Sequence, residues 1–562
     1  MIRPVAIGVS AVVALGMVFA GAAPASAVVT GPVSANPSPY ATPGCLGLDT
    51  PQAPFGSLNY LNSEVEPQVA VDPTNPNHLV GVWQQDRWSD GGAHGLVAGY
   101  STNGGLSWTV SPQPFSVCYH ASGFAGDYLN YQRASDPWVS IGPGTPAGPS
   151  GSTVYSVSLS FDQTPYPGDP NARNNAVGAA VSYDGGATWT NVQAIIADPC
   201  FSGSFGPPGY TCNSAKAYVF NDKESVTADP THPGVAYAVW DRLVAPPASF
   251  PGFIHERAYF GQTFFSKTTD YGQHWSTPNI IVGLASQDQT IGNQIVINRQ
   301  NGALYDFFNL IQNASNRGGQ RGYNVAFVSS TDGGATWSSP HVLAALETVG
   351  VSDPNNLDPT TNAPPAPSRT GDIIPEPAIN PNTGQLYVTW QDARFNGFTN
   401  DEAVVSTSSN GGVTWSPPAR VNSHTGQPAY DPSIYVNAAG QVAVSYFQWR
   451  TTTSGNEPTD LFITHSTSPG SSSAVPTFDG PAALDGPFNN LAAPFAGGYF
   501  LGDYQGLVAN PSGFIPFYVK TNCADGGPAT QPSCRAIQSV LSPTDLTPTG
   551  NNATDVYAAP GS

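Results

Sequence analysis

The sequence predicts an all-β protein, and three features of the chain support this fold class. Glycine and proline are abundant, with 60 and 55 copies in 562 residues, and these two residue types disfavour helices most. Short apolar, strand-like runs recur along most of the chain and are separated by turns. Between several pairs of runs stands an Asp or Asn followed by Gly, the strongest short-range hairpin signal. We therefore expect a succession of hairpins.

One hairpin pattern, S-x-D-x-G-x-T-W, has five copies. In residues 182–189, Asp184 can bond turn amides, Gly186 accepts a positive φ angle and Trp189 has an apolar face to bury. The five copies occupy residues 101–108, 182–189, 268–275, 330–337 and 408–415. The pattern resembles the Asp-box, or BNR, repeat of sialidases and related β-propellers. The resemblance implies a propeller and spans most of the chain.

A second pattern recurs upstream of these Asp boxes. An acid, usually followed by Pro, opens a strand; a D-P or N-P turn follows, and a second strand ends in Trp, Asp and Arg. The stronger and weaker copies open at Glu66, Asp136, Glu224, Asn293, Glu376, Asp431 and Asp503. Nine of the eleven tryptophans fall at the two repeated positions, which indicates internal repetition. We predict a β-propeller of seven four-stranded blades. Six blades, the number in sialidases, is the alternative.

The chain divides into four segments. Residues 1–27 combine Arg3, an apolar run and A-S-A at 25–27, the pattern of a secretory signal peptide. Residues 28–60 are a Pro-, Ser- and Gly-rich leader, and a strand from it is a candidate to complete the short last blade. Residues 61–545 form the predicted propeller. We expect residues 546–562 to be a disordered tail.

Charge and cysteine content bear on the environment and the partners. The net charge of −20 argues against nucleic acid and anionic membranes as partners, whereas local arginines still allow an acidic sugar. Six cysteines in a secreted chain suggest disulfides. The pairs Cys200–Cys212 and Cys523–Cys534 are close in sequence, and Cys45–Cys118 follows only by elimination. We expect a secreted, extracellular monomer.

Propeller connectivity sorts the motifs by face. The first strand of each blade lines the channel and successive strands alternate in direction, so the turns after strands one and three share a face. The Asp boxes therefore lie opposite the starts of the first strands. The acids expected at the channel mouth are Glu66, Asp136, Glu224, Glu376, Asp431 and Asp503. The ends of the second strands add Asp86, Arg87, Asp241, Arg242, Asp392, Arg394 and Arg450.

Roles follow from the resemblance. In sialidases three arginines hold the substrate carboxylate, a tyrosine activated by a glutamate is the nucleophile, and an aspartate is the acid/base. The substrate-binding candidates are Arg87, Arg242 and Arg394, with Arg450 in reserve. The catalytic candidates are Tyr504 as nucleophile, Glu376 or Glu224 as its partner, and Asp86 as the acid.

Each assignment has a structural alternative. A Trp-x-Asp-x-Arg element can be an Asp–Arg pair that holds neighbouring blades in register, and Tyr504 can simply fill the channel wall. Several carboxylates at one channel mouth repel one another unless they are protonated or bridged by a cation, for which Ca²⁺ is suited. Solvated acids in a wet channel are the other interpretation. We expect no required cofactor.

The best functional hypothesis from the sequence is an exo-acting, sialidase-like glycoside hydrolase. Its substrates would be terminal acidic sugars of glycoconjugates, sialic acid first. A polysaccharide lyase acting on uronic-acid polymers is an alternative enzyme. The third hypothesis is a propeller that binds glycans or proteins and catalyses no reaction. The fold alone does not choose among them.

Overall fold

The computed structural model describes residues 28–33, 37–48, 58–163, 174–198, 218–246, 258–285, 287–312, 322–353, 358, 361, 363–424, 426–450, 458–522 and 554–562. Within these ranges the protein is all-β, as predicted, and its helices are short: α1 (Pro43–Leu46), α2 (Val117–Ala121) and the 3₁₀ turn η2 (Asn490–Ala492). In the described part of the chain, no helix has the length and apolar character needed to span a membrane.

The strands follow one another in groups of antiparallel hairpins. The first two groups are β1 (Asn59–Val71), β2 (Leu79–Trp88), β3 (Ala93–Ser101), β4 (Thr109–Pro112) and β5 (Arg133–Thr145), β6 (Gly148–Phe161), β7 (Asn175–Ser182), β8 (Thr190–Asp198). The next two are β9 (Tyr218–Ala228), β10 (Ala236–Ala245), β11 (Phe260–Thr268), β12 (Asn279–Ile280) and β13 (Gln289–Ile297), β14 (Leu304–Gln312), β15 (Gly322–Ser330), β16 (His341–Ala345). Single pairs join the groups into two larger sheets: Ala93 with Ala134, and Gly261 with Gln289.

The second half of the chain repeats this order. The fifth and sixth groups are β19 (Glu376–Ile379), β20 (Leu386–Asp392), β21 (Glu402–Ser408), β22 (Ala419–Arg420) and β23 (Ala429–Val436), β24 (Val442–Trp449), β25 (Pro458–Ser468), β26 (Thr477–Phe478), with β27 (Ala482–Asn489) paired to β25. The last group is β29 (Gly506–Asn510), β30 (Gly513–Thr521) and β31 (Thr554–Ala558). A small separate sheet joins β17 (Val351–Asp353), β18 (Ala366–Arg369) and β28 (Tyr499–Phe500).

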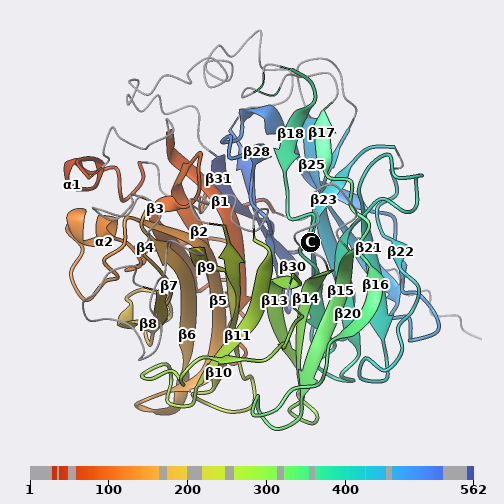
Figure 1. Ribbon diagram of the computed structural model, residues 1–562, viewed down its shortest axis with the longest axis horizontal. Coiled ribbons are helices and arrows are strands. Elements are labelled where there is room, and N and C mark those ends of the chain that lie inside the picture. Colours follow the sequence, from red (N-terminus) through yellow and green to blue (C-terminus); the bar gives the residue numbers. More distant parts are fainter. Residues whose placement is uncertain are drawn as a thin grey trace, which may run out of the picture.

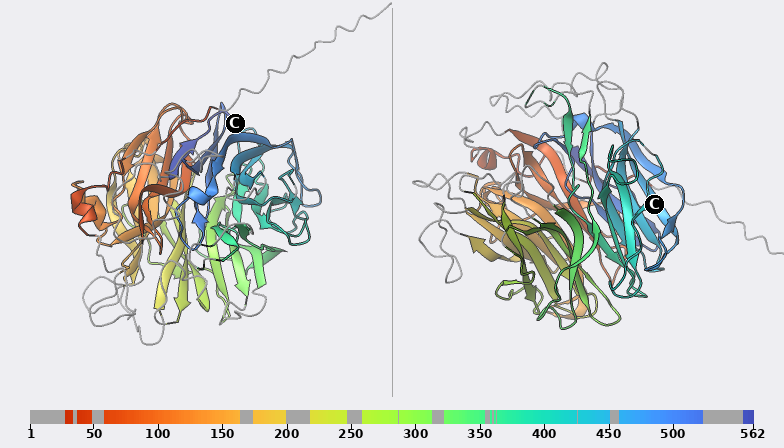
Figure 2. Two further views of the ribbon diagram at one scale, coloured as in Figure 1. Left: turned by 90° about the horizontal axis from the view of Figure 1, so that it is seen from above. Right: turned by 45° about the vertical axis from the view of Figure 1, so that its right-hand side comes forward.

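The first strand of every group faces a common channel. β1, β5, β9, β13, β19, β23 and β29 contact one another in this order, and β29 contacts β1 again. Residues of all seven strands line one cavity of about 770 Å³. In Figure 1 the sheets follow one another around the molecule from orange through green to blue. The arrangement is propeller-like, and Figure 2 shows it from two further sides.

The hydrophobic core lies between successive sheets. One cluster combines Val177 and Ala179 of β7 with Val226 of β9 and Trp240 of β10. Similar clusters occur between the other sheets, so each group buries one face against the next. The repeated tryptophans of the second strands, such as Trp83 and Trp390, are fully buried there.

Residues 28–33 pair with the last strand of the chain. The amide of Thr30 donates to the carbonyl of Ala558 (2.7 Å), and the amide of Val33 donates to that of Val556 (2.7 Å). The expected disordered tail at 546–562 is therefore wrong for Thr554–Ala558, which form β31 on β30. Thr, Val and Tyr in T-D-V-Y-A favour a strand, and the Gly- and Asn-rich sequence before them hid this signal.

The leader is also fixed to the first group of strands. A disulfide joins Cys45 and Cys118, with a Cα–Cα distance of 4.8 Å, which confirms the pairing suggested by elimination. Tyr40 is fully buried and donates its hydroxyl to the carbonyl of Leu96 (2.7 Å). The expected pairs Cys200–Cys212 and Cys523–Cys534 lie outside the described residues.

The five Asp boxes form one repeated hydrogen-bond network. In the copy at 182–189, the hydroxyl of Ser182 accepts from the amide of Gly186 (2.8 Å), and Asp184 accepts from the amide (2.9 Å) and the hydroxyl (2.6 Å) of Thr188. Each box connects the third and fourth strands of its group. His78, in the turn after β1, contacts the carbonyl of Gly185 (2.9 Å). The boxes and the first turns thus share a face, as predicted.

Candidate active site

Five first strands carry a β-bulge at the end opposite the Asp boxes. The pairing register of β1 slips between Val65 and Gln68, and equivalent slips occur in β5, β9, β13 and β23. The first residues of the bulges have positive φ angles: Glu66 (55°), Asp136 (49°), Lys223 (49°), Gly292 (75°) and Asp431 (46°). For residues other than glycine this conformation costs about 1 kcal/mol or more, and a bulge redirects its side chain. Three of the acid-Pro pairs, which begin at Glu66, Asp136 and Asp431, therefore mark bulges at the channel mouth.

In two repeat copies, the acid that opens the sequence pattern does not occupy the bulge position. Counted from the turns that begin at Asp72 and Asp229, the residue of β9 equivalent to Glu66 is Lys223 and not Glu224. Similarly, Glu376 corresponds to Gln68 and lines the channel two residues below the bulge position. The sequence analysis grouped the copies by their opening acid, whereas in the structure equivalent positions are equally far from the turn that follows.

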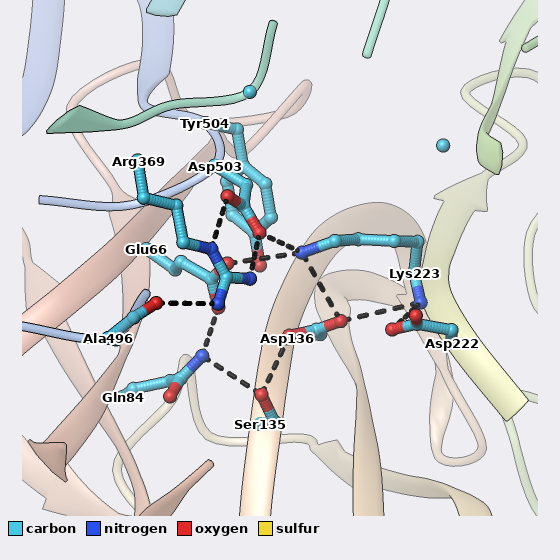
Figure 3. Close-up of polar contacts among 12 residues, drawn as sticks. Glu66, Gln84, Ser135, Asp136, Asp222, Lys223, Arg369, Ala496, Asp503 and Tyr504 are labelled. Carbon is cyan, nitrogen blue, oxygen red and sulfur yellow. Dashed lines mark hydrogen bonds and ion pairs between the residues drawn. The ribbon is translucent and has the colours of Figure 1, made fainter. Parts of the chain in front are cut away.

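Lys223 joins three of the channel-mouth acids (Figure 3). Its ammonium nitrogen lies 2.7 Å from Asp503 Oδ2, 3.1 Å from Glu66 Oε1 and 3.5 Å from Asp136 Oδ2. The side chain of Lys223 is only 9% exposed and the three acids are buried, and burial favours neutral forms unless opposite charges are close. The ammonium group thus occupies the position between carboxylates for which the sequence suggested a cation. Among the described residues, no group of three His, Cys, Asp or Glu side chains is arranged to hold a metal ion.

Arg369 of β18 completes the cluster. Its Nε donates to Asp503 Oδ1 (3.2 Å) and its Nη2 donates to Asp503 Oδ2 (2.8 Å), the bidentate geometry that guanidinium and carboxylate favour. Nη1 donates to the carbonyl of Ala496 (3.3 Å). Asp503 is therefore held from two sides by cations from β9 and β18.

The surroundings of these three acids give them different pKa values. Burial raises the pKa of Asp503, but Arg369 and Lys223 outweigh burial and hold this pKa well below its usual range. Burial raises the pKa of Glu66 to about 8, although Lys223 opposes the change. Burial also raises the pKa of Asp136, and Lys223 together with the Ser135 hydroxyl reverses that shift. At neutral pH the cluster therefore contains ionised Asp503 and Asp136 beside a mostly protonated Glu66.

Arg87 and Arg369 form a pair of neighbouring cations. Both guanidinium groups lie over the ring of Phe500, at 4.8 and 4.5 Å from its centroid. Burial and then the charge of Arg369 lower the pKa of Arg87 to about 10. Nη1 of Arg87 donates to Gln84 Oε1 (2.7 Å), and its buried Nε has no hydrogen-bond partner. Two adjacent guanidinium groups with an unused donor favour an anionic ligand.

A cavity of about 210 Å³ opens beside this cluster. Its charged lining residues are Lys223, Arg369, Asp372 and Asp503, and loop residues around Gly350, Gly371 and Gly497 complete it. Burial and nearby Asp401 raise the pKa of Asp372 to about 7, and the hydroxyl of Thr348 donates to its Oδ2 (3.1 Å). A smaller cavity of about 30 Å³ adjoins Arg87, Asp136 and Arg369. The larger volume suits a single sugar ring.

Tyr504 lies in the cluster but is not arranged as a nucleophile. Its hydroxyl donates to the carbonyl of Pro137 (3.1 Å), and its ring packs edge-on against Trp138. Burial, followed by the charges of Glu66 and Asp136, raises the pKa of Tyr504 well above its usual value. These neighbours oppose formation of the phenolate that would attack a sugar.

The other predicted catalytic residues lie elsewhere. Asp86 is fully buried and accepts from the hydroxyl of Ser38 (2.7 Å) and the amide of Asn62 (2.7 Å), which ties the leader to β1. Glu376 accepts from Gln294 Nε2 (3.2 Å) in the channel, where burial raises its pKa to about 8. Glu224 is buried beside Lys223, and neither of its oxygens has a hydrogen-bond partner.

Three predicted substrate-binding arginines are held by separate acids. Arg394 binds Asp392 through Nε and Nη2 (both 2.7 Å), and Arg242 and Arg450 bind Asp198 and Asp460. These contacts agree with the alternative interpretation, in which the arginines form structural Asp–Arg pairs. Only Arg394 pairs with the acid of its own Trp-x-Asp-x-Arg element. Asp431 stays at the mouth, where its Oδ1 accepts from the amide of Gly371 (2.8 Å). Of the four arginines, only Arg87 reaches the cluster.

The sequence analysis missed Lys223, Arg369 and Asp372. Lys223 could have been found by counting six residues back from Asp229, as Glu66 stands six before Asp72. Arg369 and Asp372 belong to the segment that leads into β19, outside the repeat pattern, and carry no periodic signal. Their contacts depend on the small sheet of β17, β18 and β28, which pairs segments far apart in sequence.

Comparison with known proteins identifies the repeat. Residues 255–446 match the family model of the BNR repeat-like domain, and this segment holds three of the five Asp boxes. No curated protein matches the chain. Similar solved structures include a Penicillium chrysogenum α-L-arabinanase complexed with arabinobiose, at 11% identity, with 69% of this chain and 90% of that one covered and a TM-score of 0.41.

Two sialidases are similar at the same level. A Hadza microbial sialidase is 15% identical, with 78% of this chain and 73% of that one covered and a TM-score of 0.40. The Trypanosoma rangeli sialidase in complex with the inhibitor DANA is 12% identical, with 72% and 55% covered and a TM-score of 0.38. These values assign no substrate and no site residue to this chain. Residues 255–446 thus resemble a BNR repeat-like domain, and the two Asp boxes that precede this segment carry the same sequence pattern.

Proposed function

We propose that this protein is a secreted glycoside hydrolase that removes a terminal, carboxylate-bearing sugar from a glycan, with sialic acid as the first candidate. The observation that carries the proposal is the 210 Å³ cavity, whose lining combines Asp372, Asp503 and two cations. A pair of carboxyl groups with separated pKa values is what most glycoside hydrolases use to cleave the glycosidic bond.

The two carboxyl groups have complementary protonation states. Asp372, with its pKa raised to about 7, retains a proton near neutral pH and can donate it to the glycosidic oxygen as the bond to the sugar breaks. Asp503, held ionised by Arg369 and Lys223, can stabilise the positive charge that develops on the sugar ring. Water then forms a bond to the sugar carbon and gives its proton to Asp372, which is restored to its protonated form. Tyr504 has a positioning role, since it packs against Trp138 and lies 5.6 Å from the Lys223 ammonium, measured to its ring centroid.

The charge of the site favours an acidic sugar. Lys223, Arg369 and Arg87 are cationic, whereas Asp503 and Asp136 are ionised and Glu66 is mostly protonated at neutral pH. The cations therefore outnumber the anions among these six residues. A substrate carboxylate on Arg369 would lie near Arg87, which adjoins the smaller cavity, and would relieve the repulsion between the two guanidinium groups.

We further propose seven blades for the propeller. Seven first strands contact one another in cyclic order, and residues 28–33 supply the outer strand of the last blade beside β31. The sequence of residues 1–27 and the Cys45–Cys118 disulfide support export to an oxidising compartment.

A glycan-binding protein without hydrolytic activity is the second candidate. It is favoured by one observation: both oxygens of Asp503 are already bound by cations, which lowers the basicity of this carboxylate. Such a protein would bind an acidic sugar in the same cavity and release nothing.

The test is a panel of methyl glycosides of sialic acid, glucuronic acid and arabinofuranose, with free sugar measured by mass spectrometry. We expect release from the sialoside and a fall in kcat/KM of about 100-fold in Arg87→Leu, because one charged contact to the carboxylate is lost. Release of arabinose alone would contradict the acidic substrate. Ultraviolet absorbance from an unsaturated uronate, produced from a uronic-acid polymer, would instead show a lyase. Saturable binding with no release would show the non-catalytic function.

A further inference from the structure

Two exposed phenylalanines stand on the loop between β20 and β21. Phe395 and Phe398 are 42% and 56% exposed, and Val349, on the neighbouring segment, is 48% exposed. Large apolar side chains gathered on a surface mark binding sites more often than isolated ones do.

The loop that carries these rings is held rigidly. Arg394 binds Asp392 through two hydrogen bonds of 2.7 Å, and its Nη2 also donates to the carbonyl of Ala345 (2.5 Å). The side chain of Asn396 closes the turn, since its Nδ2 donates to the carbonyl of Asn400 (2.7 Å) and its Oδ1 accepts from the amide of Thr399 (2.9 Å). The rings therefore project from a fixed backbone, which reduces the entropy lost on binding.

Phe398 also has an unfavourable backbone conformation. Its φ angle is +62°, which is rare for a bulky residue and costs about 1 kcal/mol or more. A buried ring could offset this cost by packing, but the ring of Phe398 is more than half exposed. Strain of this kind concentrates at functional sites.

A short segment links the loop to the active-site cavity. The amide of Ala393 donates to the carbonyl of Glu347 (2.8 Å), and the amide of Val349 donates to Asp401 Oδ1 (2.8 Å). The next two residues of this segment, Gly350 and Val351, line the 210 Å³ cavity. The hydroxyl of Thr348 bonds both Asp401 (2.6 Å) and Asp372 (3.1 Å). The surface around Val349 thus borders the cavity on the side of Asp372.

We propose that Phe395, Phe398 and Val349 form a second sugar-binding subsite, which holds the sugar next to the terminal one. The C–H face of a sugar ring is apolar and packs on an aromatic ring, and rigid aromatic side chains supply contact area at low entropic cost. Asp372 donates its proton to the bond that leaves the cavity, and the leaving sugar therefore emerges next to Val349. This inference rests on the proposed function for its direction along the glycan.

The experiment compares Phe395→Ala and Phe398→Asn with the wild-type protein. Asparagine tolerates a positive φ angle, so the second change removes the ring without adding backbone strain. The substrates are a trisaccharide with terminal sialic acid and the methyl sialoside, whose methyl group is too small to reach the rings. We expect KM for the trisaccharide to rise about 5- to 20-fold in each variant with kcat unchanged. Both constants for the methyl sialoside should stay the same.

The control variant is Leu106→Ala. Leu106 is as exposed as Phe398, at 56%, but lies in an Asp box on the opposite face. It should leave KM for both substrates unchanged. Equal KM values for the trisaccharide in the wild-type protein and both phenylalanine variants would overturn the subsite.

Binding measurements separate this proposal from the proposed function. If the wild-type protein releases no sugar, calorimetric titration with the trisaccharide still applies. Loss of affinity in the phenylalanine variants but not in Leu106→Ala would then support the subsite while the hydrolase proposal fails. Normal hydrolysis with unchanged trisaccharide affinity would leave the hydrolase intact and reject the subsite.

Discussion

The two faces of the molecule use the same repeats in different ways. On one face the Asp boxes reproduce one hydrogen-bond network five times, and each acid or amide is satisfied by its own turn. On the other face the bulges repeat in backbone conformation, yet their first residues are Glu66, Asp136, Lys223, Gly292 and Asp431. The difference teaches that the repeat is uniform where it stabilises turns and varies where its side chains meet. The proposed site therefore lies where the copies diverge.

The largest expected effect comes from removing the central cation. Lys223→Met leaves Glu66, Asp136 and Asp503 buried without their shared partner, and breaking a buried ion network of this kind costs about 3–5 kcal/mol. Denaturant unfolding measures the loss, and hydrolysis should be abolished. Lys267→Met is the control, because Lys267 donates only to the carbonyl of Gly333 (3.1 Å) near an Asp box. A loss below 1 kcal/mol in Lys223→Met would show that the cluster does not depend on its lysine.

The next effect concerns the proposed proton donor. Asp372→Asn should lower kcat by about 100- to 10,000-fold, the usual contribution of a general acid, while trisaccharide binding persists. In the wild-type protein Asp372 must be protonated, so kcat should fall as the pH rises through about 7. A pH–rate profile of the wild-type protein and the residual rate of the variant test this together. A variant that keeps the same descending limb would exclude Asp372 as the acid.

A smaller effect is expected for Glu66. The folded protein keeps the proton of Glu66 up to a pKa of about 8, whereas an unfolded chain releases it near 4.5, so folding takes up a proton between these values. Stability due to this group is thus complete below about 4.5 and falls as the pH rises toward 8. Glu66→Gln removes the proton uptake. As the pH rises from 5 to 8, the free energy of unfolding of the wild-type protein should therefore fall by about 1–3 kcal/mol relative to that of Glu66→Gln. Parallel stability curves for the two proteins would contradict this assignment.

The smallest effect belongs to the Asp-box face. Asp184→Ala loses the bonds to the amide and hydroxyl of Thr188 and should cost about 1 kcal/mol, with hydrolysis unchanged. Asp184→Asn should be nearly neutral, because Asn103 and Asn410 occupy the same position in two natural copies. They accept from the equivalent backbone amide and donate to the equivalent hydroxyl. Thermal unfolding and the methyl sialoside assay distinguish the two. Loss of activity at constant stability in Asp184→Ala would place function on the wrong face.

Local patterns in the sequence were sufficient for the all-β class, the Asp boxes and the sharing of one face by these boxes and the turns after the first strands. These features depend on turn chemistry and strand alternation, which are properties of neighbouring residues. Arg87, Glu66, Asp136 and Asp503 could also be predicted, since they belong to repeat copies. The partners of the arginines could not be predicted. Arg242 and Arg450 lie at strand ends equivalent to that of Arg87, but Asp198 of β8, in the preceding group, and Asp460 of β25 bind them. Arg369 and Asp372 reach the cavity through long-range pairing that no local pattern encodes.

The most direct test of the whole account is a crystal structure of Asp372→Asn soaked with the sialylated trisaccharide. The account predicts electron density for the terminal sugar in the cavity between Arg369, Asp503 and Asn at position 372, with its carboxylate directed toward Arg87 and Arg369. Density in the central channel or beside the Asp boxes, with this cavity empty, would contradict it.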